Sequence, residues 1–111
     1  MTDERRACPR SPFFARVVLT TDDGAPPREA RSFDLGLGGV GLTCPSPLDI
    51  GRAVVAAFHL AGPGGRGVVE AVPGQVVDVR ADESGTILGV RFLAPLDRGA
   101  SPELTRRLDA P

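Results

Sequence analysis

With 111 residues, the chain is long enough for one domain with a single modest hydrophobic core. Its formal net charge of −1 argues against a broad electrostatic attraction to nucleic acid or to a membrane surface. Every basic residue is an arginine, whose planar guanidinium group suits bidentate binding of phosphate and stacking on bases. Those in the first third of the chain are Arg5, Arg6, Arg10, Arg16, Arg28 and Arg31.

The cysteine content and the N-terminal residues indicate a cytoplasmic protein. Cys8 and Cys44 do not make a disulfide framework, and no cluster of Cys and His has the spacing of a metal site. We therefore expect reduced thiols. Residues 1–10 are polar and charged and lack the apolar stretch of a signal peptide, and no run is apolar enough to span a membrane.

The pattern of apolar residues predicts an arm followed by short strands. Residues 1–12 are polar, basic and interrupted by prolines, so we expect an irregular arm, with the folded domain spanning residues 13–111. Beyond the arm, segments with alternating or β-branched residues are typical of strands. These segments are residues 13–20, 28–34, 39–44, 53–60, 68–80 and 86–93.

Three local features refine these expectations. In residues 53–60 the apolar positions repeat every two residues, which places Val54, Ala56, Phe58 and Leu60 on one face. Pro73-Gly74 should interrupt the long strand of residues 68–80 with a bulge. In the loop of residues 45–52, Leu48 and Ile50 are expected to lie under the core.

The C-terminal residues predict a short helix. Ser101 is a suitable N-cap, Pro102 suits the first helical position, and Glu103 places an acid in the first turn. Leu104 and Leu108 are four residues apart, as on one helical face. Six or seven strands and this helix predict an all-β antiparallel barrel or sandwich, and a closed barrel suits a chain this small because closure removes exposed edges.

No arrangement of residues predicts catalysis. His59 is the single histidine and lies on an apolar strand, which favours a partly exposed structural role. The Ser and Thr residues have no adjacent base, and no phosphate-binding G-x-x-x-x-G-K-[ST] loop is present. The sequence therefore predicts a binding protein that is not an enzyme and has no metal or cofactor.

The stretch from Ser32 to Thr43, S-F-D-L-G-L-G-G-V-G-L-T, is the first candidate binding element. Asp34 stands before the glycines Gly36, Gly38 and Gly39, a residue type that accepts φ > 0 and permits close approach to the backbone. An aspartate can accept hydrogen bonds from the Watson–Crick edge of guanine.

The second candidate element is the R-x-x-x-R segment formed by Arg6 and Arg10. In an extended or turning segment these two arginines can approach one anion from two sides, through bidentate bonds to phosphate and stacking on a purine. A small guanine nucleotide with two negative charges would satisfy both elements.

Together these two elements resemble the PilZ domain family. The family pattern is R-x-x-x-R in an N-terminal arm, followed after one hairpin by [D/N]-x-S-x-x-G. Residues 6–10 read R-A-C-P-R, and residues 34–39 read D-L-G-L-G-G. The final strand, G-V-R-F-L at residues 89–93, and the terminal helix also resemble the family, so the resemblance covers nearly the whole chain.

The resemblance implies a six-stranded antiparallel β-barrel that binds cyclic di-GMP (c-di-GMP) and passes the signal to a protein partner. By this resemblance Arg6 and Arg10 would hold phosphates and guanines, Asp34 would contact a guanine edge, and Gly39 would allow close approach. Arg5 is a neighbouring candidate for the same role. The protein would act as a monomer or homodimer, with neither nucleic acid nor membrane as a partner.

Gly36 departs from the family pattern, because it stands where the family has serine. A neutral hydrogen bond is worth about 0.5–1.5 kcal/mol, so its loss weakens binding roughly tenfold at most. An alternative is therefore a PilZ-fold protein that binds no nucleotide and acts through protein contacts, for instance in motility or polarity. A third alternative, a barrel that binds nucleic acid, lacks a net positive charge and lacks Trp and Tyr for stacking.

Overall fold

The structure is a computed structural model, and it describes residues 10–83 and 85–109. Within these residues the chain forms seven strands, one 3₁₀ turn and one α-helix. The elements are β1 (Ser11–Pro12), β2 (Arg16–Thr21), β3 (Arg28–Leu35), β4 (Gly39–Cys44), β5 (Ala53–Ala61), η2 (Pro63–Gly65), β6 (Gly67–Asp82), β7 (Gly85–Phe92) and α1 (Pro102–Asp109).

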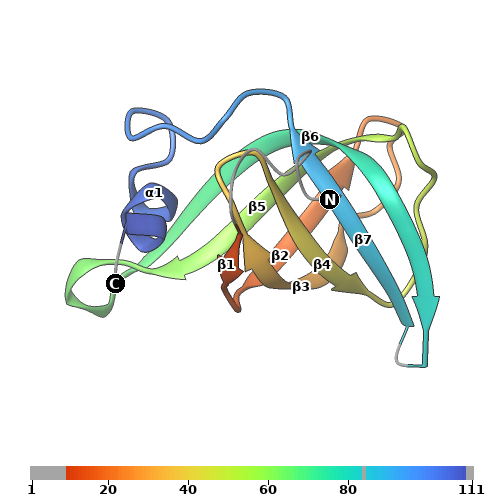
Figure 1. Cartoon of the computed structure of the whole chain (residues 1–111), viewed down its shortest axis with the longest axis horizontal. Helices are drawn as coiled ribbons and strands as arrows, with labels where there is room; N and C mark the ends of the chain where they lie inside the picture. The colour runs from red at the N-terminus through yellow and green to blue at the C-terminus, as the bar shows by residue number, and fades with distance from the viewer. Residues whose placement is uncertain (1–9, 84, 110–111) are drawn as a thin grey trace, which may run out of the picture.

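The strands close into a barrel (Figure 1). Neighbouring strands follow the order β3-β2-β5-β6-β7-β4, and pairing of β4 with β3 completes the ring. Every pairing is antiparallel, and β1 adds a short extra strand beside β3. Among the described residues this arrangement confirms the all-β, six-stranded antiparallel barrel with a short C-terminal helix.

The core lies inside this barrel and follows the alternation of the sequence. On β5, Val54, Ala56, Phe58 and Leu60 are buried as predicted, whereas His59 is half-buried on the outer face. Phe58 lies at the centre of the core, with the rings of Phe13 and Phe92 each 6.4 Å from its own ring.

Helix α1 packs against the barrel beside the β5–β6 hairpin (Figure 1). Its first residue is Pro102, and Leu104 is fully buried, as the sequence predicted. Arg107 in the last turn donates a hydrogen bond to the carbonyl oxygen of Ala61 at 2.6 Å and lies 6.0 Å from the centre of the Phe13 ring.

The predicted interruption of the long strand at Pro73-Gly74 is wrong. Strand β6 runs without a break through both residues, and its register shift lies between Val76 and Asp78. Pro73 is tolerated because it lies opposite the end of β7, where its carbonyl oxygen accepts a hydrogen bond from the Leu93 N–H at 3.1 Å. The N–H that proline lacks would have made a hydrogen bond only at the end of the ladder between β6 and β7.

Two smaller predictions also differ from the structure. Leu48 is buried as expected, but Ile50 is 67% exposed because it lies at the tip of the turn closed by the Arg52 N–H and the Asp49 carbonyl oxygen. The strand predicted for residues 13–20 begins only at Arg16. Just before Arg16, the backbone N–H of Ala15 donates its hydrogen bond to the Ser32 hydroxyl at 2.9 Å instead of to a carbonyl oxygen of a neighbouring strand.

Candidate ligand-binding site

An irregularity in β3 directs two consecutive side chains to one place on the outside of the barrel. The pairing of β3 with β4 shifts between Ser32 and Asp34, so Phe33 is an extra residue in the ladder. A Cβ atom added to Gly41 would lie 2.6 Å from both Asp34 Oδ1 and Phe33 Cζ. Both side chains therefore cover Gly41. Bulges of this kind often redirect side chains next to functional sites.

Asp34 is held in place by hydrogen bonds to one of its oxygens. Oδ1 accepts a hydrogen bond from the Gly41 N–H at 2.8 Å and another from Arg10 Nη1 at 3.3 Å. The side chains of Arg10 and Asp34 keep 29% and 27% of their exposure, so this ion pair is accessible from solvent. The structure thus joins one arginine of the R-x-x-x-R segment to the aspartate of the second element.

Gly39 lies directly beneath the Arg10 guanidinium group. A Cβ atom at this position would be 3.0 Å from Arg10 Nη2 and 2.6 Å from the carbonyl oxygen of Val90 on β7. The positive-φ glycines are Gly24, Gly51, Gly64, Gly65 and Gly85, so none of them falls in the glycine-rich stretch. The sequence suggested two reasons for glycine here, a positive φ angle and close approach of other groups to the backbone. At Gly39 only the close approach applies.

The turn between β3 and β4 carries the remaining glycines. The Gly36 N–H donates a hydrogen bond to the Gly39 carbonyl oxygen at 2.9 Å, which closes the turn. The carbonyl oxygen of Gly38 accepts a hydrogen bond from the Phe92 N–H at 2.9 Å, and that of Leu37 accepts one from the Leu96 N–H at 2.8 Å. The turn is therefore fixed to the last residue of β7 and to the segment that follows it.

Some of the predicted site residues lie in the part of the chain that the structure describes, and others lie outside it. Arg10, Asp34 and Gly39 meet at one position, and Gly36 and Gly38 lie in the adjoining turn. Arg5 and Arg6, like Cys8, lie outside the residues that the structure describes.

Sequence reasoning missed three residues near this position: Phe33, Gly41 and Arg91. No local pattern marks the bulge that turns Phe33 outward. Gly41 pairs with Asp34, and Arg91 pairs with Gly39, in the two ladders of β4. Their position follows from strand register, which only the pairing reveals.

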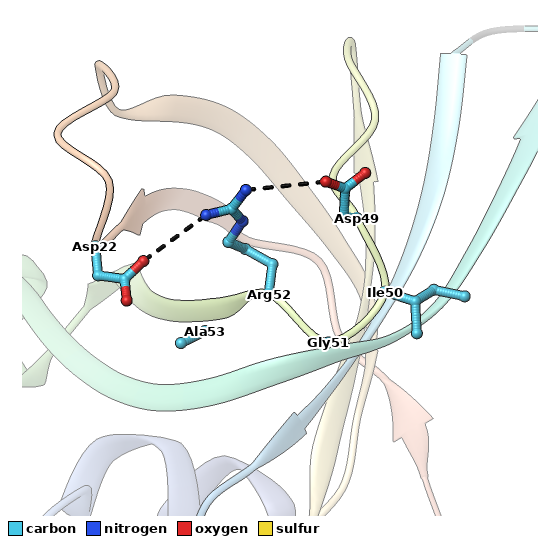
Figure 2. A pocket seen from close by; sticks show the side chains of 6 residues that line it. All are labelled: Asp22, Asp49, Ile50, Gly51, Arg52 and Ala53. Carbon is cyan, nitrogen blue, oxygen red and sulfur yellow. Dashed lines mark ion pairs between the residues drawn. The ribbon is translucent and has the colours of Figure 1, made fainter.

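Away from this position, a hollow of about 380 Å³ lies beside the loop before β5 (Figure 2). Figure 2 shows the Arg52 guanidinium group between Asp22 and Asp49. One carboxylate oxygen of each aspartate lies 3.9 Å from a guanidinium nitrogen. Asp23 lies 3.5 Å from the same group. Because three carboxylates surround this arginine, its charge is already compensated, and the hollow is a poor site for an anion.

Within residues 10–83 and 85–109, no three His, Cys, Asp or Glu side chains are grouped so that they could hold a metal ion. In that same part of the chain, no helix combines the length and hydrophobicity needed to cross a bilayer.

Residues 4–109 match the PilZ domain family. Since this match spans nearly the whole chain, the protein belongs to the PilZ domain family, which confirms the resemblance seen in the sequence. The chain matches none of the curated proteins.

Solved PilZ structures share the fold. The PilZ domain of Escherichia coli YcgR, solved with c-di-GMP, has a TM-score of 0.70 and 21% identity, over 94% of this chain and 88% of that chain. The PilZ domain of CeSA, from a cellulose-synthesizing bacterium, has a TM-score of 0.62 and 18% identity, over 92% of this chain and 99% of that chain.

A larger protein contains the same fold. MotI (DgrA), the inhibitor of motility of Bacillus subtilis, has a TM-score of 0.71 and 11% identity, over 96% of this chain. The chain spans about half the length of MotI, 53%. At these identities the similarity establishes a common fold.

Proposed function

We propose that this protein is a c-di-GMP receptor without catalytic activity that passes the signal to a protein partner. The observation that supports the proposal is the ion pair of Arg10 and Asp34 at 3.3 Å, beside Gly39. These residues come from the two motif elements, which are separated by a hairpin in the sequence. The presence of c-di-GMP in the YcgR PilZ structure supports the choice of ligand.

The chemistry of the three residues suits the two kinds of group in the ligand. A guanidinium group such as that of Arg10 can bind a phosphate through two hydrogen bonds and can stack on a guanine. The carboxylate of Asp34 can accept hydrogen bonds from the N–H groups on the Watson–Crick edge of guanine. Gly39 leaves room for the ligand, and we assign Arg5 and Arg6 the same role as Arg10.

Isothermal titration calorimetry with c-di-GMP tests this function, with GTP as a control for general phosphate affinity. Arg10→Ala and Asp34→Ala should each weaken binding about 10–100-fold, because a hydrogen bond to a charged group is worth about 1.5–3 kcal/mol.

The chain offers a matched control in the ion pair of Arg16 and Glu29, which joins β2 to β3 at 2.6 Å. Glu29 is on the same strand as Asp34. Because Arg16→Ala and Glu29→Ala remove the same charges as the two site variants, but away from the site, they should leave the affinity unchanged. Equal affinity in the unmodified protein and in both site variants would contradict the proposal, as would equal binding of GTP.

Gly36 supports a second candidate, a PilZ protein that binds no nucleotide and acts through protein contacts in motility or polarity. If the first function holds, Gly36→Ser should strengthen c-di-GMP binding up to roughly tenfold, the value of one neutral hydrogen bond. If neither the unmodified protein nor Gly36→Ser binds c-di-GMP, the second candidate is favoured. In either case we propose a cytoplasmic protein that acts as a monomer or homodimer, without nucleic acid or membrane as a partner.

A further inference from the structure

Arg91 on β7 is the cross-strand neighbour of Gly39, the glycine that lies beneath Arg10. Gly39 and Arg91 are paired in the ladder between β4 and β7. The next pair, Val40 and Val90, is fully buried, so Gly39 and Arg91 belong to the outer face of the barrel. Arg10 Nη2 and the Cα atom of Arg91 lie 3.0 Å and 3.5 Å from the position that a Gly39 Cβ atom would occupy.

A neutral side chain positions the Arg91 guanidinium group. Arg91 Nη2 donates a hydrogen bond to Gln75 Oε1 at 3.2 Å, and Gln75 Nε2 donates to the Gly51 carbonyl oxygen at 3.2 Å. Gln75 and Arg91 are also paired between β6 and β7, so their side chains share one face. The two hydrogen bonds orient the guanidinium group without neutralising it.

The charge of Arg91 has no carboxylate partner within 4.0 Å in the described part of the chain. Arg52, which has three such partners there, shows the opposite arrangement. Arg91 is exposed, so an anion can reach it from solvent. An oriented, exposed and uncompensated arginine beside a candidate binding site is suited to binding an anion.

We propose that Arg91 is a further ligand-binding arginine, which binds a phosphate of the cyclic dinucleotide from the β7 side of Gly39, and that Gln75 is its positioning residue. The inference rests on the proposed function. A cyclic dinucleotide carries two phosphates, and two arginines beside Gly39, Arg10 from the segment before β1 and Arg91 from β7, match two anionic groups better than Arg10 alone. Arg91 thereby extends the site from the arm and β3 to β7.

Calorimetric titration of the full chain with c-di-GMP tests this role at two salt concentrations. Arg91→Ala should weaken binding about 10–100-fold and should reduce the loss of affinity on adding salt, because one exposed charge interaction is gone. Arg91→Lys keeps the charge but cannot make the bidentate hydrogen bonds of a guanidinium group, so its affinity should lie between those of Arg91→Ala and the unmodified protein.

Two further variants separate positioning from folding and from overall charge. Gln75→Glu would place a carboxylate beside Arg91 and compete with the ligand phosphate, so it should weaken binding while the melting temperature stays within a few degrees. Arg66→Ala removes an exposed arginine from the β5–β6 loop and should leave the affinity unchanged.

The outcomes distinguish this inference from the proposed function. If the unmodified protein binds and Arg91→Ala binds equally well at both salt concentrations, the role of Arg91 is wrong and the proposed function stands. If Arg66→Ala weakens binding as much as Arg91→Ala, the effect is one of overall charge, and the role of Arg91 is again wrong. If the unmodified protein does not bind c-di-GMP, the proposed function fails and this inference fails with it.

Discussion

Glu70 on β6 accepts a hydrogen bond from the backbone N–H of Leu104, 34 residues later in the chain, at 2.9 Å. The second oxygen of the same carboxylate accepts one from the Glu103 N–H at 2.8 Å. Glu70 thus satisfies two free N–H groups in the first turn of α1 and places a negative charge at the positive end of the helix dipole. Since Glu70 is only 8% exposed, this interaction joins α1 to the barrel through a buried contact.

Replacing Glu70 with alanine should detach the start of α1 from the barrel. Two buried N–H groups would lose their acceptor, at a cost of about 1–3 kcal/mol, or roughly 5–15 °C in melting temperature. Differential scanning calorimetry measures this loss. Glu83→Ala, which removes an exposed carboxylate from the turn after β6, is the control and should have little effect. Equal melting temperatures for the two variants would show that Glu70 does not fix the helix.

The lowered pKa of Glu103 predicts how the stability of the fold depends on pH. Hydrogen bonds from Arg106 and then from Arg107 lower the pKa of Glu103 below its usual value of 4.5, although burial opposes the change. Because the pKa is lower in the folded state, the stabilisation is present above pH 4.5 and is lost as the pH falls through the lower, folded-state value. Glu103→Gln should therefore be less stable than the unmodified protein at pH 6.

The difference between Glu103→Gln and the unmodified protein should narrow as the pH falls from 4.5 toward the folded-state pKa. Thermal unfolding followed by circular dichroism at several pH values from about 6 to about 3 measures this change. A constant difference in melting temperature over that range would mean that the ion pairs of Glu103 do not contribute.

The parts of the fold that the sequence predicts are those set by local alternation. The buried face of β5 follows from its period of two, and α1 follows from Pro102 and from the spacing of Leu104 and Leu108. Contacts between distant segments are not predictable in this way. Glu70 lies at a buried position between apolar residues of β6, and nothing local indicates that a helix 34 residues away supplies its partners.

The candidate site shows the same limit. Its motif residues Asp34 and Gly39 are visible in the sequence, because their type and spacing carry the resemblance to the family. The outward position of Phe33 depends on a register shift in β3, and the position of Arg91 depends on the pairing of β7 with β4. Neither Phe33 nor Arg91 is marked by its sequence neighbours, so strand register was needed to find them.

Gly41→Ala tests how far Asp34 depends on close approach. The added Cβ atom would lie 2.6 Å from Asp34 Oδ1 and from the Phe33 ring, both of which are side-chain atoms that can move. The fold should therefore survive, but Asp34 should lose its hydrogen bond from the Gly41 N–H and move from its place beside Arg10. If the proposed function holds, c-di-GMP affinity should fall about tenfold, as expected for the loss of about 1.4 kcal/mol.

Stability and binding must be measured together for Gly41→Ala. Circular dichroism should report a folded barrel, and calorimetry should report the weaker binding. Unchanged affinity in a folded Gly41→Ala variant would mean that the position of Asp34 is not critical for the ligand.

Gly38 and Gly39 provide a comparison between neighbouring glycines. At Gly39 an added Cβ atom would lie 2.6 Å from the Val90 carbonyl oxygen, a backbone atom that can move only if β4 and β7 separate. At Gly38 nothing lies within 4 Å, and its φ is not positive, so alanine fits there. Gly39→Ala should therefore destabilise the protein by about 1–3 kcal/mol, as overpacking does, whereas Gly38→Ala should be neutral or stabilising by about 0.4–1 kcal/mol.

Urea denaturation of both variants measures these two free energies of unfolding. Each variant adds one methyl group to adjacent positions of the chain, so the change in the unfolded state is nearly the same, and the difference between them reports the contact of Gly39 with β7. If Gly39→Ala is as stable as Gly38→Ala, then the close approach of β7 and Arg10 does not explain the glycine at position 39.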